Sequence, residues 1–413
     1  MIKRSPDDFQ VDEILDPQFL SQLKDSGPFA LYRLNKETLA TPEAIGRAAR
    51  ELKVPANAFA YAGLKDKHAR TVQHVSLSVE KAPAPPEKSS SDGWSLERLG
   101  FAARAIESSD IHRNRFRLTV RNLSPQDCFD MDRARRLLSD TPESKKGATE
   151  SENPAPAGNI RVVNYFGDQR FGSARHGRGF VAKNLIKKDF EGALQLAIAT
   201  EARKDRMEQK TFKRLIRENW GKWKELLPKL RPCPDRKAIE RLVNSGGDFR
   251  AAFCALPYMF QQLCVYAYQS HLWNAIARRV IEQRCTPLGA VLAADDTFGE
   301  MLFPTNEALP DDLRELEIPL LARKTELREP WKNAAVEILK SEGIELGELE
   351  IPGVRRPFFG EEPRRLFFLA ENFSIGAPAS DETANDPKRK KRTLTFDLPR
   401  GCYATVLLRA LGQ

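Results

Sequence analysis

The chain has 413 residues, of which 41% are hydrophobic and 30% are charged, values typical of a globular protein with two or three domains. No apolar run reaches the roughly eighteen residues that span a bilayer, which excludes a membrane helix. The N-terminal residues turn acidic too early for a secretory signal, so we expect a cytoplasmic protein.

The cysteines and histidines argue against disulfides and metal sites. The six cysteines are scattered without a CxxC pair, and the five histidines show no metal-binding spacing. Neither a GxxxxGK[ST] phosphate loop nor a GxGxxG motif is present. The sequence therefore predicts reduced thiols, and neither a metal nor a nucleotide cofactor.

The net charge of +9 is concentrated in residues 203–241, where fourteen Lys or Arg residues stand against six Asp or Glu residues, a local balance of +8. Phe212, Trp220 and Trp223 are interleaved with these cations, a mixture that suits a polyanion with exposed bases. A solvated helical face whose rings pack inward explains the composition equally well. If this stretch binds RNA, the expected phosphate contacts are Lys210, Lys213, Arg214 and Arg217.

The N-terminal part of the chain predicts strands followed by a helix. Alternating or apolar runs indicate strands at residues 9–13 and 29–34. A helix is expected to begin with Thr41 as N-cap and Pro42 in its first position.

Residues 59–79 carry the feature that points most directly to chemistry. An apolar strand breaks at Gly63, charged side chains crowd into residues 65–68, and alternation resumes over residues 71–79. Neighbouring cations keep a carboxylate ionised, so Asp66 is available as a nucleophile or base. A polar turn with solvated charges is the alternative interpretation.

A second candidate stretch follows the strand predicted at residues 160–166. Residues 167–172 begin and end with glycine and contain Arg170, and Asn164 lies just upstream. Together they offer many hydrogen-bond partners for a planar polar ligand. A structural hairpin with a paired Arg170 is the competing interpretation.

The remaining pattern changes from β-rich to helical and back. Residues 184–353 are predicted to be helical, with the longest helix at 257–284, whose aromatic stripe is expected to be core. Further strands are expected at residues 101–106, 115–120, 364–369 and 394–398, a helix at 127–138, and an amphipathic end at 403–411. Polar loops are expected at residues 81–93, 140–158 and 377–392, the last with a solvated basic run at 388–392.

Strands that bracket a helical block most simply belong to one sheet that carries the block as an insertion. The sequence therefore predicts an α+β protein with a discontinuous domain. Its expected parts are residues 1–183 and 355–413, with a largely helical inserted domain at residues 184–354.

Several motifs together resemble one family, the TruD-type pseudouridine synthases that act on uridine 13 of tRNA. They are Lys3 with residues 6–13, then residues 62–69 with Thr71 and Gln73, then residues 164–172, and finally residues 398–409. The helical signature at residues 267–274 is a weaker match. The matches run from end to end in the family order, which makes the combination specific.

This resemblance implies a mixed, mainly antiparallel sheet of the pseudouridine-synthase type and a reaction without cofactor. It implies that Asp66 is the catalytic residue, and that Phe9, Asn164 and Tyr403 line a uridine pocket with Phe166 near the base. The other residues expected to bind substrate are Lys3, Lys65, Gln73 and Arg170. RNA, and tRNA in particular, is the expected partner, with no membrane and no obligatory protein partner.

Two other functions would also use parts of this sequence. A non-catalytic RNA-binding protein on the same scaffold would not need Asp66, yet the residue is present with its surrounding motif. A nuclease or phosphotransferase would need several carboxylates to hold metal ions, and the motifs supply one. The leading hypothesis is thus an isomerase that converts uridine to pseudouridine.

Overall fold

The computed structural model describes residues 4–140, 158–172, 178–202, 205–296 and 299–413. The chain forms two compact units, which we treat separately. Unit 1 combines Met1–Val162 with Phe368–Gln413, and unit 2 is Val163–Phe367. Lys3 and nearly all of the loop expected at 140–158 lie outside the described residues, and the domain division at 184 and 354 stays a prediction.

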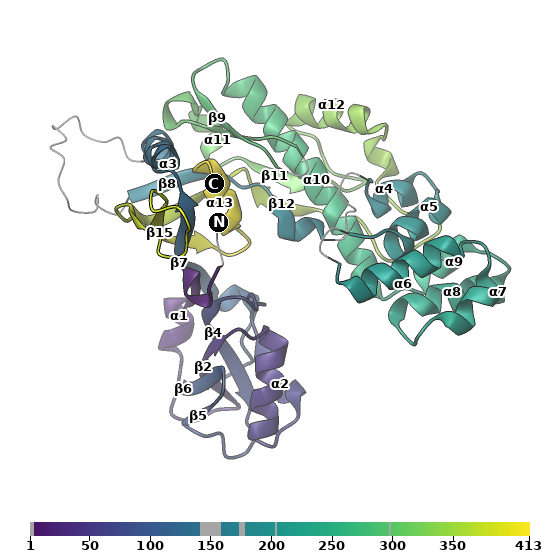
Figure 1. The fold of residues 1–413 in the computed structure, drawn as a ribbon, viewed down its shortest axis with the longest axis horizontal. Helices are drawn as coiled ribbons and strands as arrows, with labels where there is room; N and C mark the ends of the chain where they lie inside the picture. The colour runs from purple at the N-terminus through teal and green to yellow at the C-terminus, as the bar shows by residue number, and fades with distance from the viewer. Residues whose placement is uncertain (1–3, 141–157, 173–177, 203–204, 297–298) are drawn as a thin grey trace. The chain divides into compact units, whose positions relative to one another are not determined.

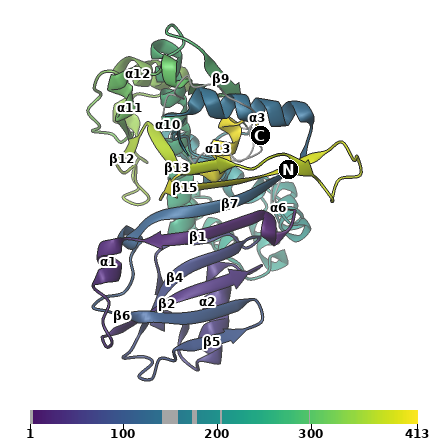
Figure 2. The same cartoon turned by 90° about the vertical axis from the view of Figure 1, so that its left-hand side faces the viewer.

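Unit 1 is built on one sheet with the order β5-β6-β2-β4-β1-β7-β15-β13-β8 (Figure 2). Of the pairs with a described register, β1 with β4 is parallel and the others are antiparallel. The predicted mixed, mainly antiparallel sheet is confirmed. Its main strands are β1 (Phe9–Leu15), β2 (Phe29–Glu37), β3 (Phe59–Tyr61), β4 (Arg70–Ser78), β5 (Lys88–Ser91), β6 (Trp94–Ala102), β7 (Ile111–Leu123), β8 (Gly158–Val163), β13 (Phe367–Ile375) and β15 (Lys390–Pro399).

The helix α2 (Thr41–Glu51) covers the face of β2 and β4 (Figure 1). Alternate residues of the two strands, such as Tyr32 and Val75, are fully buried in the same cluster as Ala44 and Ala48 of the helix. Burial of this apolar surface is the main force that seats the helix. The N-cap is Ala40 rather than Thr41, whose hydroxyl has another partner.

Two of the predicted polar loops contain strands. Within residues 81–93, β5 pairs with β6 in register, because a polar strand at the edge of a sheet needs only its backbone to form a ladder. Within residues 377–392, β14 (Ala379–Ser380) pairs with the start of β15. The prediction that the basic run at residues 388–392 is solvated is also wrong at its last residue, since Arg392 is buried and pairs with Asp132 at 2.9 Å.

Two helices complete the described part of unit 1 beside the C-terminal strands. The helix α3 (Pro125–Leu138) starts two residues earlier than predicted, because Ser124 caps it through the backbone N–H of Asp127. The short helix α13 (Ala404–Ala410) follows β15, as the amphipathic pattern predicted. The strand predicted at residues 101–106 lies earlier, as β6, which ends at Ala102.

Unit 2 is largely helical around α10 (Tyr258–Arg284), close to the predicted 257–284. Its aromatic stripe is core, as expected, and the indole of the buried Trp273 donates to the carbonyl of Ile318 at 2.8 Å. The other helices are α4 (Val181–Ile186), α5 (Phe190–Leu194), α6 (Met207–Glu218), α7 (Trp223–Leu226), α8 (Pro234–Ser245), α9 (Phe249–Cys254), α11 (Asp311–Arg314) and α12 (Lys332–Glu342).

Four short strands complete the described part of unit 2. They are β9 (Val291–Ala294), β10 (Met301–Pro304), β11 (Glu317–Leu320) and β12 (Glu362–Arg365), paired as β9 with β10 and β11 with β12. The sequence did not predict β9, β10 or β11, whereas β12 overlaps the start of the strand expected at residues 364–369. Each is four residues long, too short for a period-two pattern to stand out. None of the helices in the described ranges is both long and apolar enough to cross a membrane.

Candidate active site

The loop between β3 and β4 carries Asp66, which is half-buried. The backbone of this loop is held by the ammonium group of Lys36, which donates to the carbonyls of Asp66 at 2.9 Å and Lys65 at 3.5 Å. The same ammonium donates to the carbonyl of Leu39 at 2.8 Å. The N–H of Lys65 donates to the hydroxyl of Thr41 at 3.0 Å. The loop is therefore fixed at several backbone atoms on both sides of the Asp66 side chain.

The side chain of Lys65 anchors the same loop to the sheet. Its ammonium lies 2.6 Å from Glu13 Oε1 and donates to Asn114 Oδ1 at 3.0 Å. Burial acts to raise the pKa of Glu13, yet hydrogen bonds from His74 and the charge and hydrogen bond of Lys65 outweigh it and hold that pKa below its usual range. These partners occupy Lys65, so we assign it support of the Asp66 loop rather than contact with substrate.

The side chain of Gln73 also has a hydrogen-bond partner inside unit 1. It is fully buried on β4, and its Oε1 accepts a hydrogen bond from the Thr41 hydroxyl at 2.8 Å. That hydroxyl in turn accepts from the N–H of Lys65, so a chain of hydrogen bonds runs from the strand to the loop. The expected contact of Gln73 with substrate does not fit its burial, and the geometry indicates that it supports the loop.

Lys36 was missed by the sequence analysis. It is 2% exposed, and it lies on the face of β2 that also presents the buried Ala30, Tyr32 and Leu34. Burial, the largest influence, lowers the pKa of Lys36 to about 8, with Asp66 acting to raise it and Lys65 to lower it. The available signal was a lysine at an inward position of an alternating apolar strand.

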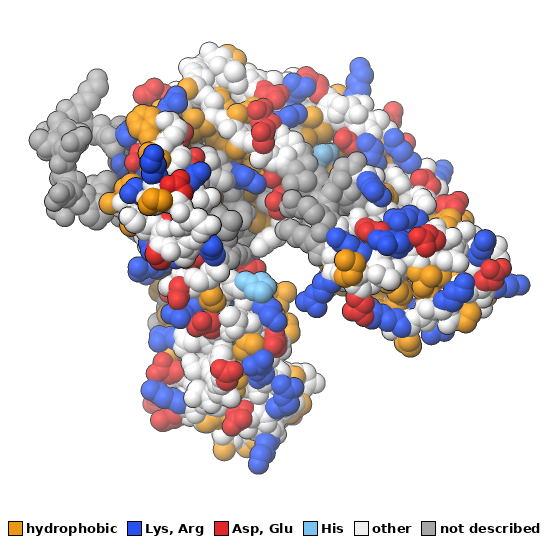
Figure 3. All heavy atoms as spheres, viewed as in Figure 1, with side chains coloured by type: hydrophobic (Ala, Val, Ile, Leu, Met, Phe, Trp, Pro, Cys, Tyr) orange, Lys and Arg blue, Asp and Glu red, His pale blue; other side chains and the backbone are white. Residues whose placement is uncertain are grey.

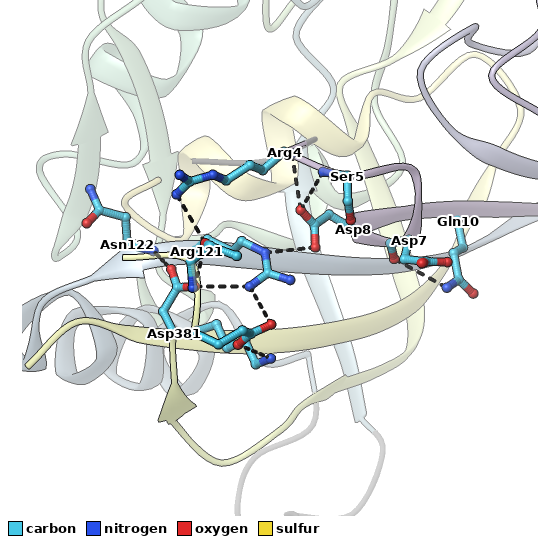
Figure 4. Close-up of polar contacts among 11 residues, drawn as sticks. Arg4, Ser5, Asp7, Asp8, Gln10, Arg121, Asn122 and Asp381 are labelled. Carbon is cyan, nitrogen blue, oxygen red and sulfur yellow. Dashed lines mark hydrogen bonds and ion pairs between the residues drawn. The ribbon is translucent and has the colours of Figure 1, made fainter. Parts of the chain in front are cut away.

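Phe9 begins β1, and its ring makes a T-shaped contact with that of Phe116, with the centroids 6.1 Å apart. The turn before it is closed by Asp8, whose carboxylate accepts from the N–H groups of Arg4 and Ser5 (Figure 4). Phe9 itself is 6% exposed. The direction in which β1 leaves this turn is therefore set by Asp8.

Arg121 on β7 holds this N-terminal turn in place (Figure 4). Its guanidinium lies 2.9 Å from Asp8 and 3.0 Å from Asp381, and all three side chains are at least nine-tenths buried. Burial acts to raise the pKa of Asp381, but hydrogen bonds from Thr383, the Asn122 N–H and Arg121 hold it far below its usual range. The network joins the start of the chain to the segment that leads into β15.

Tyr403 is the N-cap of α13 and is half-buried. The preceding strand ends beside the supports of the Asp66 loop, because Leu398 of β15 pairs with Asn114 of β7, which also pairs with Glu13 of β1. Tyr403 follows Leu398 by five residues. The register thus brings the start of α13 to the end of the strands that hold Lys65.

Asn164 belongs to unit 2, where both ends of its carboxamide make a hydrogen bond. Its Nδ2 donates to the carbonyl of Arg365 at 3.1 Å, and its Oδ1 accepts from Arg364 at 2.6 Å. Its backbone N–H donates to the carbonyl of Leu366 at 2.8 Å, and β8 ends one residue earlier. The strand predicted to reach residue 166 is therefore shorter.

Phe166 is surrounded by cations and rings within unit 2. The guanidinium of Arg364 lies 3.9 Å from its ring centroid and that of Arg170 lies 5.3 Å away, while Trp273 meets it edge-on at 5.7 Å. Its backbone N–H and carbonyl both bond to the side chain of Asn274, at 2.8 and 3.0 Å. The helical signature at residues 267–274 thus fixes the segment that carries Phe166.

The candidate phosphate contacts lie on α6, whose visible surroundings carry Lys and Arg side chains mixed with acidic ones (Figure 3). Lys213 does not fit this role, since it is buried and its ammonium lies 2.6 Å from Asp205. Arg214 and Arg217 are exposed and lie 3.7 and 3.3 Å from Glu201. The surface that remains for phosphate is Lys210, Arg214 and Arg217.

The aromatic residues of this stretch pack on neighbouring protein groups. Trp220 and Trp223 meet edge-to-face at 4.8 Å, and both contact the ring of Phe249 at 6.2 Å. The indole N–H of Trp220 donates to Glu191 at 2.9 Å. The packing favours the interpretation in which these rings support the fold rather than stack on bases.

Asp66 thus sits on a constrained loop in a sheet-based unit, and a cation-rich aromatic site lies in the helical unit. Within the described ranges, no group of three or more His, Cys, Asp or Glu side chains is arranged to hold a metal ion. We compared the chain with known proteins. The family tRNA pseudouridine synthase D (TruD) matches residues 1–411.

The chain belongs to the TruD family. It is 29% identical over 414 residues to the probable tRNA pseudouridine synthase D 1 of Methanococcus maripaludis, covering 98% of both chains. It is 29% identical over 424 residues to the tRNA pseudouridine synthase D of Aquifex aeolicus, covering 99% of this chain and 97% of that one.

A solved structure shows the same fold. The crystal structure of the putative TruD from Methanosarcina mazei superposes with a TM-score of 0.69, covering 99% of this chain and 92% of that chain at 23% identity. The resemblance drawn from the motifs and the α+β fold are confirmed. TruD membership makes the chain a pseudouridine synthase, an isomerase, and nothing found supports the non-catalytic alternative.

Proposed function

We propose that this TruD enzyme isomerises uridine 13 of tRNA and that Asp66 is its catalytic residue. The observation that carries the assignment is the Asp66 loop, whose backbone is bonded to Lys36 and Thr41 while Lys65 is bonded to Glu13. Such rigid support is what a group needs to stay within reach of a reacting atom. The match of the family over residues 1–411 supports the choice of substrate.

The reaction exchanges one bond of the uridine for another. The bond between N1 of uracil and C1′ of ribose breaks, the detached base turns, and C5 forms a bond to C1′. The hydrogen on C5 leaves as a proton and N1 takes up a proton, so the product is an isomer of the substrate. The Asp66 carboxylate serves as nucleophile or base in this sequence, which needs no external oxidant or cofactor.

The substrate is a base that has been turned out of its stack, and aromatic rings and amides replace the contacts that it loses. In unit 1 we assign this contact to Phe9 and Tyr403. For unit 2, the family resemblance alone assigns Phe166 and Asn164 to substrate. Arg170, which lies near the rings of Phe166 and Tyr266 and bonds to Ser270, supplies positive charge. Lys3 remains among the residues proposed to contact substrate, while Lys65 and Gln73 are assigned to support of the Asp66 loop instead.

The test is Asp66→Asn, which keeps the size of the side chain and removes its charge. We expect loss of tritium release from RNA labelled at C5 of uridine, with RNA affinity unchanged and no metal added. Asp92→Asn, at an exposed loop position, is the matched control. An Asp66→Asn enzyme within about tenfold of the parent rate, or about 1.4 kcal/mol of barrier, would refute the assignment.

The position of the modified uridine has its own measurement. Carbodiimide treatment of tRNA after incubation, followed by primer extension, is expected to stop the polymerase next to residue 13. If the RNA releases tritium but the polymerase stops elsewhere, the proposed isomerisation stands and the proposed position, uridine 13, is refuted.

We further propose that the enzyme works in the cytoplasm. Its six cysteines, all within the described residues, are free thiols, which suits a reducing compartment. Fractionation of cells, followed by immunodetection of the chain, tests this location.

A further inference from the structure

We propose that Lys36 is a positioning residue for the isomerisation, because its buried ammonium fixes the backbone of the loop that presents Asp66. This inference rests on the proposed role of Asp66 and adds a group that the family motifs of the sequence analysis do not contain. Lys36 does not touch the reacting atoms. It acts through the peptide groups on which the Asp66 side chain is mounted.

The geometry uses every donor that Lys36 has. An ammonium carries three N–H bonds, and three backbone carbonyls lie within reach, at 2.8 Å for Leu39, 2.9 Å for Asp66 and 3.5 Å for Lys65. Two of these carbonyls belong to the loop, and the third to the segment that enters α2. The ammonium therefore joins the loop to the end of β2 at a single point.

The positive charge of Lys36 is essential to these three hydrogen bonds. Burial of an ammonium is costly unless its hydrogen bonds are made and an opposite charge is near. The charged groups that face it are Asp66, which favours the protonated amine, and Lys65, which disfavours it. Its paired neighbours on the adjacent strands, Thr71 of β4 and Trp94 of β6, are uncharged.

Loss of the proton would loosen the loop. A neutral amine keeps two N–H donors for three carbonyls and no longer balances the Asp66 carboxylate. The pKa of Lys36 is lowered to about 8, so this loss falls at mildly alkaline pH. We expect the single-turnover rate at saturating RNA to fall as one ionisation above about pH 8.

The folding stability is expected to rise over the pH range in which the rate falls. The pKa of Lys36 in the folded chain, about 8, lies below its ordinary value of 10.5, so the folded state releases the proton first. By linkage, the contribution of this group to folding stability rises with pH between those two values. A fall in rate without a matching fall in melting temperature is therefore the signature of positioning, since a purely structural lysine would leave the rate at saturation unchanged.

Two substitutions test the inference. Lys36→Met keeps the length of the side chain without donors, and we expect the single-turnover rate at saturating RNA to fall about 100-fold with little change in Kd for RNA. Lys36→Arg keeps the charge at all accessible pH values, so the activity that it retains should lack the decline above about pH 8. Lys183→Met is the control, because the ammonium of Lys183 is also engaged, in an ion pair with Glu342 at 2.7 Å, but lies in unit 2.

The outcomes separate this inference from the proposed function. Normal turnover by Lys36→Met, with Asp66→Asn inactive, overturns the role of Lys36 and leaves Asp66 catalytic. An active Asp66→Asn enzyme refutes the proposed function itself. A decline above about pH 8 that persists in Lys36→Arg belongs to another group, such as the uracil ring, and also overturns the inference. If Lys36→Met does not fold, the rate and melting temperature of the parent and Lys36→Arg enzymes are measured side by side against pH. A decline in rate that Lys36→Arg lacks supports the inference, and one that both enzymes share overturns it.

Discussion

Replacement of Arg121 by Met is expected to destabilise unit 1 by removing one cation from two buried carboxylates. Arg121 lies 2.9 Å from Asp8 and 3.0 Å from Asp381, whose side chains are 2% and 0% exposed. Its contact with Glu382 adds little, because that side chain is 56% exposed and water screens the pair. Met fills similar space, so the change tests the charge rather than the packing.

The structure sets the size of this effect. Breaking a buried ion pair by removing one partner costs about 3–5 kcal/mol. We expect about 3 kcal/mol, because Asp8 keeps its bonds from Arg4 and Ser5, and Asp381 keeps those from Asn122 and Thr383. For a unit of this size, that free energy lowers the melting temperature by about 6–12 °C.

The dependence on pH gives the test its direction. The pKa of Asp381 is depressed in the folded chain, so its contribution to stability is present above its ordinary value of 3.8 and is lost as the pH falls. The gap in melting temperature between parent and Arg121→Met should therefore be widest near neutral pH and narrow below about pH 4. Thermal unfolding followed by circular dichroism measures it.

A matched control is available on the same sheet. Arg33 pairs with Glu97 at 3.4 Å, but both side chains are more than 40% exposed, so Arg33→Met should cost under about 1 kcal/mol. Equal shifts for the two arginine variants, or a gap that does not change with pH, would show that the buried network contributes no more than a surface pair.

Two further predictions concern unit 2. Reversal of charge at Lys210, Arg214 and Arg217 should weaken binding of any RNA and flatten the salt dependence of its affinity, without changing the rate at saturation. Lys213→Met should instead lower stability and leave the salt dependence intact, because Lys213 is buried against Asp205. Filter binding across several salt concentrations distinguishes the two variants, and an unchanged salt dependence for the triple variant would mean that these cations form a solvated face. Asn274→Ala should destabilise unit 2 by about 1–3 kcal/mol, because the N–H and carbonyl of Phe166 lose their partners, and should slow turnover in the same samples; a fully active, equally stable variant would contradict this role of Asn274.

Local pattern determined much of this protein. The strands β1, β2, β4 and β7 and the helices α2 and α10 all lie close to where periodicity predicts them, because apolar residues recur along them at strand or helix spacing. Asp66 was found by its motif and by the charges beside it in sequence. The family, and with it the reaction, also followed from residues that are read in order along the chain.

Only the tertiary structure decided which polar side chains face inward. Lys213 and Lys210 are three residues apart on one helix and look alike in sequence, yet burial and Asp205 remove Lys213 from the surface. Gln73 and Lys65 are engaged by partners far away in the chain, at Thr41 and Glu13. Such pairings depend on strand register and not on neighbouring residues.

Lys36 shows the same limit most clearly. In the sequence it is one lysine near the end of a strand, and its proposed role emerges only when the carbonyls of Leu39 and of the Asp66 loop meet around its ammonium. The edge strand β5 and the short strands β9, β10 and β11 follow this rule as well, since their pairing comes from backbone hydrogen bonds that leave no mark in side-chain periodicity. Sequence determines which faces are apolar, and the fold determines which polar groups those faces enclose.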